Sequence, residues 1–148
     1  DVPYPPLDEE IRILHATTAR AGPEVEAVLS GEDVIKLQAL VREVAIAPDL
    51  VAFAARLVRG TRPGADGGLP ELAPLIEWGA GPRAGQALIL AAKARALLSG
   101  RFAVATADLL SLAAPVLRHR LVLSAIAHAD GVRADEVVER LVKKVPRP

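Results

Sequence analysis

The residue of this sequence that is best placed to do chemistry is Arg83, which follows Gly81 and Pro82 and leads into an Ala- and Leu-rich stretch. Proline is favoured in the first turn of a helix, because the N–H that it lacks would have no partner there. The pattern therefore predicts a helix that begins at Pro82, with Arg83 in its first turn. This is an unfavourable end for a cation, since a helix N-terminus already carries partial positive charge.

We expect Arg83 to share one face of this helix with three apolar residues, and we predict this face to be the buried one: Ala87, Leu90 and Ala94. An arginine there needs an anion opposite it, and a guanidinium beside free helix N–H groups makes a good phosphate site. The simpler interpretation is a surface arginine whose stem covers apolar side chains while its head stays in water. The local pattern leaves both interpretations open.

A metal site is a second kind of chemistry that the sequence raises, because it contains three histidines, His15, His119 and His128. His119 and His128 are nine residues apart, which does not place them on one helix face in ligand geometry. Structural zinc almost always needs four close nitrogen or sulfur ligands. The chain has no cysteine, which also excludes disulfides and thiol catalysis. We therefore predict no metal site.

The elements that position these residues are predicted to be helices, which makes the chain all-α. Hydrophobic residues make up 51% of the 148 residues and aromatic residues only 3%, so the core consists of Ala, Val and Leu and favours closely packed helices. A short helix broken at Pro74 is predicted within 70–78, and residues 44–46 and 102–104 could form one tiny two-stranded ribbon. The main predicted helices cover 8–19, 30–44, 48–58, 82–99, 106–116 and 134–145. Thr106 is the expected N-terminal cap of the helix over 106–116.

The balance of charge argues against nucleic acid and membranes as partners. Basic and acidic residues are equal at 18 each, although residues 61–120 hold seven basic and only four acidic ones. A local basic excess suits one phosphate cluster better than a long polyanion. No apolar run is long enough to span a bilayer and no signal peptide opens the chain, so we predict no membrane insertion and a cytoplasmic location.

Most of the chain resembles the C-terminal helical lid of the MoxR-type ATPases, a branch of the AAA+ superfamily. The block from Gly79 to Ala84 followed by Gly100-Arg101 is the specific part of this resemblance, and the other matching segments are individually weak. One departure is Gly81, where the family usually has a serine. The matching segments are Tyr4-Pro5, Glu9-Glu10, Ile13-Leu14, Thr61-Arg62, Gly79–Ala84, Ala91–Ala94, Gly100–Val104, Asp108, Val116–Arg120 and Val145–Pro148.

The resemblance implies a role for Arg83 as the sensor 2 arginine, a catalytic residue that contacts the phosphates of ATP, with Gly81 and Pro82 beside the nucleotide. The sequence has no phosphate-binding loop and no strand that ends in paired acids for Mg²⁺. It begins at Asp1 without a methionine and is interpreted as a fragment. We expect 1–7 to be a linker from a missing ATPase core and 8–148 to be the lid. ATP and Mg²⁺ would bind only in the parent ATPase, and the fragment alone would not hydrolyse ATP.

The resemblance also implies partners: the ATPase core of the same chain, the neighbouring subunits of a ring that is expected to be hexameric, and a client that is remodelled or receives a metal. Arg62, His119 and Arg120 are candidates for these interfaces. The alternative for Arg62 is a structural role in its loop, which we favour, and cations near a helix end are also explained by the helix dipole. The alternative for the whole chain is a helical protein–protein interaction module without a nucleotide role.

Overall fold

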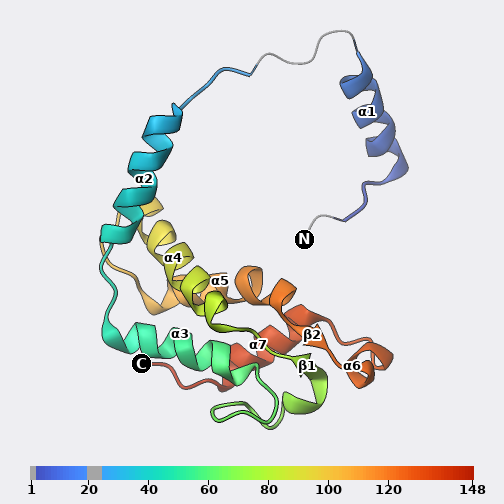
Figure 1. Ribbon diagram of the computed structural model, residues 1–148. Helices are drawn as coiled ribbons and strands as arrows, with labels where there is room; N and C mark the ends of the chain where they lie inside the picture. The colour runs from blue at the N-terminus through green and yellow to red at the C-terminus, as the bar shows by residue number, and fades with distance from the viewer. Residues whose placement is uncertain (1–2, 20–24) are drawn as a thin grey trace. The chain divides into compact units, whose positions relative to one another are not determined.

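A computed structural model describes residues 3–19 and 25–148 of the chain (Figure 1). Its Cα atoms form two compact units, Asp1–Val34 and Ile35–Pro148. The described residues contain seven α-helices, two short 3₁₀ turns and one two-stranded sheet, which confirms the all-α prediction. No helix in this part of the chain is long and apolar enough to cross a membrane.

The first unit contains helix α1 (Leu7–Thr18), close to the predicted 8–19. Asp8, Glu9 and Glu10 lie in its first turn, where carboxylates favour the helix dipole, and none of its residues is buried. The predicted linker 1–7 includes residues 1 and 2, which lie outside the described residues, so its division from the lid stays a prediction.

Helix α2 (Gly31–Glu43) begins as the sequence predicts, because Ser30 and Asp33 cap it. The Ser30 hydroxyl accepts a hydrogen bond from the Asp33 amide at 3.1 Å, and the Asp33 carboxylate accepts one from the Ser30 amide at 3.0 Å. This reciprocal pairing satisfies two donors that would otherwise have no partner. The hydrogen bonds from Ser30 lower the pKa of Asp33.

The core of the second unit lies among α3 (Pro48–Gly60), α4 (Pro82–Leu98), α5 (Thr106–Leu117) and α7 (Ala134–Lys144) (Figure 1). Helix α4 packs against both α3 and α5, and α5 packs against α7. Alanines on the buried face of α4 allow this close approach, while larger side chains from the other helices fill the centre. The largest buried apolar side chains are Phe53, Leu57, Leu88, Leu109, Leu117, Leu141, Val137 and Val138.

The small strands differ from the prediction. Residues 44–46 and 102–104 do meet, but only in a single parallel bridge, Ala45 with Ala103. The two-stranded sheet instead joins β1 (Ile76–Trp78) to β2 (Val122–Leu123) in antiparallel pairing.

The short helix predicted for 70–78 is a 3₁₀ turn, η1 (Ala73–Leu75), that leads directly into β1. Pro74 has no N–H for a longer helix, and the pairing of Ile76 with Leu123 draws the next residues into the sheet. The second 3₁₀ turn, η2 (Arg118–Arg120), and the short helix α6 (Ala125–Ala129) flank β2 and complete the fold.

Candidate functional site

Helix α4 begins at Pro82, as the sequence predicts, and Arg83 lies exposed in its first turn. Within the described part of the chain, the side chain of Arg83 has no hydrogen bond or ion pair, and no group accepts from the backbone amide of Gly81 or Arg83. The Ala84 amide donates to the carbonyl of Gly81 at 3.0 Å. The start of α4 thus combines free donors with an unpaired guanidinium.

The prediction that Arg83 lies on the buried face of α4 is wrong. The buried face carries a run of small and apolar residues at a spacing of four, which packs against α3 and α5: Ala84, Leu88, Ala92 and Ala96. Arg83 precedes this run by one residue, a rotation of about 100° around the helix. Of the three residues predicted to share its face, Leu90 is 37% exposed and Ala87 and Ala94 are half-buried.

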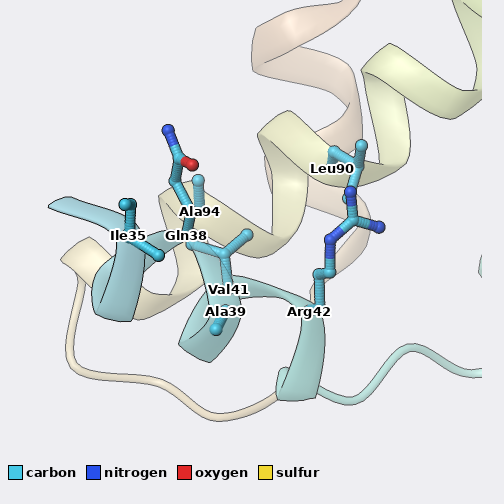
Figure 2. A pocket seen from close by; sticks show the side chains of 7 residues that line it. All are labelled: Ile35, Gln38, Ala39, Val41, Arg42, Leu90 and Ala94. Carbon is cyan, nitrogen blue, oxygen red and sulfur yellow. The ribbon is translucent and has the colours of Figure 1, made fainter. Parts of the chain in front are cut away.

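Leu90 and Ala94 instead line an open groove of about 520 Å³ between α4 and the second half of α2. Figure 2 shows the α2 side chains opposite these two residues. Lys93 ties the two helices together by donating from Nζ to the carbonyl of Arg42 at 2.8 Å. The groove lies away from the start of α4, and Arg83 is not among its lining residues, which are Ile35, Gln38, Ala39, Val41, Arg42, Leu90 and Ala94.

Thr61 and Arg62, at the end of α3, hold the segment that leads into α4. The Thr61 hydroxyl is fully buried; it donates to the carbonyl of Val58 at 2.7 Å and accepts from the amide of Ala80 at 2.9 Å. The guanidinium of Arg62 donates from Nε to the carbonyl of Ala80 at 2.9 Å. Side chains of two consecutive residues therefore satisfy both backbone groups of Ala80. We call this arrangement the Ala80 clamp.

Gly79 lets the two segments of the Ala80 clamp approach each other. A Cβ atom on Gly79 would lie 2.4 Å from the backbone oxygen of Thr61, closer than any real contact of this kind. By contrast, a Cβ atom on Gly81 would meet nothing within 4 Å. Gly79 is therefore required by a close approach of two backbone segments, whereas the position of Gly81 has room for a side chain. The sequence alone did not reveal that Thr61-Arg62 and Gly79-Ala80 are one unit.

The opposite end of α4 is held by a different arginine. Arg101 pairs with Asp108 through both guanidinium Nη atoms, at 2.8 and 2.7 Å, and the Asp108 side chain is only 3% exposed. The hydrogen bonds from Arg101 hold the pKa of Asp108 below its ordinary value. Asp108 also accepts from the amide of Ala105 at 2.8 Å, so it caps α5, and the prediction that Thr106 does so is wrong.

The basic segment from Arg118 to Arg120 forms η2 at the end of α5. Arg118 donates to the carbonyl of Ala114 at 3.2 Å and forms an ion pair with Asp135 at 3.2 Å, which joins α5 to the start of α7. Arg120 contacts the carbonyl of Val116 and the ring of His119, which is itself exposed. The contacts of Arg118 and Arg120 are internal, and an interface role for His119, Arg120 or Arg62 stays a prediction.

The three histidines lie apart from the start of α4. In residues 3–19 and 25–148, no three histidine or carboxylate side chains are close enough to hold a metal ion. His15 lies on α1, whereas His128 is near the end of α6, where its Nδ1 contacts the carbonyl of Ser124 at 2.9 Å.

Helix α4 and the elements that follow it match a known domain type. Residues 72–141, which run from η1 into α7, match the family model described as an AAA lid domain. This part of the chain is therefore an AAA lid domain, and the helical architecture agrees with that family.

Similar proteins indicate which branch of the AAA lid family the chain resembles. The chain is 32% identical over its whole length to "Chaperone MoxR1" of Mycobacterium tuberculosis, and 31% identical over 98% of its length to a protein of Bacillus subtilis named "Uncharacterized protein YeaC". A crystal structure of a "putative ATPase" from Cytophaga hutchinsonii matches 98% of the chain with a TM-score of 0.80 and 28% identity. The chain is homologous to these proteins, which confirms its resemblance to the lid of MoxR-type ATPases.

The match covers a minority of each relative. The chain spans 39% of MoxR1, 43% of YeaC and 44% of the Cytophaga chain. Most of the length of each relative therefore has no counterpart in these 148 residues.

Proposed function

We propose that this chain is the lid of a MoxR-type AAA+ ATPase and that Arg83 contacts the phosphates of ATP as its sensor 2 arginine. The observation that carries the proposal is the position of Arg83: exposed, in the first turn of α4, and without a partner in the described part of the chain. The sequence predicted Arg83 to be buried, but its exposed position also suits this role. A ligand that is bound by another domain must be able to reach the guanidinium.

The donors at the start of α4 suit an anion. The free amides of Gly81 and Arg83 and the guanidinium of Arg83 are all donors, and the helix dipole adds partial positive charge at the same end. Bound ATP would supply phosphate oxygens that accept these hydrogen bonds. A planar guanidinium can donate two parallel hydrogen bonds to such oxygens, which fixes their orientation as well as their charge.

The remaining parts of a nucleotide site belong to the rest of the proposed parent protein. ATP and Mg²⁺ would bind to its ATPase core, and Arg83 would reach the phosphates of the same subunit or of a neighbour. We further propose assembly into a ring, hexameric by analogy with the family. A chaperone-like role is supported by the name of the relative, "Chaperone MoxR1". Remodelling of a client, or insertion of a metal into it, is proposed from the family resemblance alone.

The experiment that tests this function is the substitution Arg83→Ala in the full-length protein. We expect ATP turnover to fall by about 10²- to 10³-fold, as for other charge-assisted contacts that strengthen in the transition state, with little change in the melting temperature. Arg83→Lys should recover only part of the turnover, because an ammonium lacks the planar fork. Arg140→Ala, which removes an exposed arginine from α7, is the matched control.

The result also separates this function from the alternative of a helical interaction module. The open groove between α2 and α4 favours that alternative, because Ile35, Val41 and Leu90 leave apolar surface around it. An interaction module predicts unchanged ATP turnover in Arg83→Ala. A variant that melts much lower but hydrolyses ATP normally would show that Arg83 is a structural anchor.

A further inference from the structure

We infer that Thr61 and Arg62 are positioning residues for Arg83: by holding Ala80 they fix where α4 begins, and hence where the guanidinium is presented. The inference rests on the proposed phosphate contact of Arg83. It assigns a nucleotide-dependent role to two residues that would otherwise only stabilise a loop. Ala80 is three residues before Arg83, so a change at the clamp reaches the guanidinium through a short stretch of backbone.

The clamp supplies what the start of α4 lacks. A helix usually begins at a serine, threonine, aspartate or asparagine whose side chain accepts from the first-turn amides. Gly81 occupies this cap position and has no side chain to do so. The amides of Gly81 and Arg83 have no acceptor among the described residues, so side-chain contacts can hold this start only at the residue before the cap. Within the described residues, two side-chain hydrogen bonds hold this start: the amide of Ala80 donates to the Thr61 hydroxyl, and Arg62 Nε donates to the carbonyl of Ala80.

The geometry of Thr61 makes the contact directional. Its single hydroxyl hydrogen is used on the carbonyl of Val58, which leaves an oxygen lone pair for the amide of Ala80. Because the side chain is fully buried among these groups, water cannot replace either hydrogen bond. Serine retains the hydroxyl, whereas valine has nearly the shape of threonine but neither donates nor accepts. The pair Thr61→Val and Thr61→Ser therefore separates the hydrogen bonds from the packing.

The test combines Thr61→Val with Arg83→Ala in the full-length protein and measures kcat and KM for ATP in the wild type, both single variants and the double variant. We expect Thr61→Val alone to lower kcat/KM by about 10- to 100-fold, as a misplaced contact does. In the Arg83→Ala background the same substitution should change kcat/KM by less than about threefold, because the group that it positions is already gone. Thr61→Ser should restore most of the activity.

Two controls keep loss of folding apart from loss of positioning. Thr106→Val removes a threonine hydroxyl that has no hydrogen-bond partner among the described residues, and it should leave kcat/KM unchanged. Hydrogen exchange of the peptide around Ala80 should become faster in Thr61→Val and stay slow in Thr61→Ser. The melting temperature of each variant shows whether the rest of the fold is intact.

The outcomes distinguish the inference from the function on which it rests. If Thr61→Val lowers kcat/KM by the same factor with and without Arg83, or if exchange at Ala80 is unchanged, the positioning role is overturned while the phosphate contact stands. If Arg83→Ala itself leaves ATP turnover unchanged, the phosphate contact is overturned and the positioning role falls with it.

Discussion

The two ends of α4 each carry an arginine, and the two arginines are used in opposite ways. Arg101, just beyond the C-terminal end, makes two short hydrogen bonds to the buried carboxylate of Asp108. Arg83, in the first turn, has no partner among the residues that the structure describes. A cation near the C-terminus also suits the helix dipole, whereas one at the N-terminus opposes it. By geometry and by charge, Arg101 stabilises the fold, whereas the side chain of Arg83 makes no polar contact within the described residues.

The difference shows why an unpaired cation says more about a candidate ligand site than a paired cation does. The Arg101–Asp108 pair has a clear structural role, because Asp108 caps α5 and the pair joins α5 to the segment that follows α4. The start of α4 is held through the backbone of Ala80, and the charged side chain of Arg83 takes no part in these hydrogen bonds. A rigid support under an unpaired guanidinium is the arrangement expected of a residue that binds a ligand.

The largest effect on stability should come from Asp108→Asn. This substitution leaves Arg101 opposite a neutral amide in a buried position, and we expect unfolding to become easier by about 2–4 kcal/mol. Arg83→Ala should change the free energy of unfolding by less than about 0.5 kcal/mol, as exposed substitutions usually do. Chemical denaturation of both variants measures the contrast. Equal losses in the two variants would break the distinction between the two arginines.

A smaller effect is expected from Gly79→Ala, which tests whether the support under Arg83 is as tight as the geometry indicates. The added Cβ must displace the backbone at Thr61, and we expect a loss of about 1–2 kcal/mol. Gly81→Ala is the matched control, because its Cβ would enter open space at an ordinary φ of −81°. There the poorer cap and the stiffer unfolded chain oppose each other, so the change should be near zero. If both substitutions have equal effects, the close approach at Gly79 is not a constraint.

The sequence predicted α1 to α5 and α7 because these helices carry local signals, whereas it did not predict α6. Pro48 and Pro82 mark helix starts, and the caps at Ser30 and Asp33 act within four residues. The position of Arg83 in the first turn of α4 followed from the same kind of signal. These features depend on contacts close in the chain, which is why spacing alone could find them.

The features that the sequence did not predict depend on contacts between residues far apart in the chain. The β1–β2 pairing joins residues more than forty positions apart, and Ala80 meets Thr61 across 19 positions. The buried face of α4 was misjudged for the same reason. Alanine and leucine occur all around this helix, so only the positions of α3 and α5 decide that Ala84 and Leu88 face inward while Leu90 does not.

The smallest effect should be the acid dependence of the Arg101–Asp108 pair. Arg101 lowers the pKa of Asp108 below its ordinary value of 3.8, so the folded state resists protonation more than the unfolded state does. The contribution of the carboxylate is therefore fully present above a pH of about 3.8, and it is lost as the pH falls from there through the folded pKa.

Other carboxylates also respond to acid, since Lys144 lowers the pKa of Glu71 and Ser30 lowers that of Asp33. The quantity to measure is therefore the difference in unfolding free energy between the wild type and Asp108→Asn as a function of pH. Both proteins share Glu71 and Asp33, so their contributions cancel. We expect the difference to be constant near neutral pH and to shrink below a pH of about 4, because protonated Asp108 and asparagine are both neutral. Arg101 and Arg95 both form ion pairs with Asp108. A difference that stays constant down to a pH of about 2 would mean that the charge of Asp108 contributes nothing, and that Arg101 is no more tied to the fold than Arg83 is.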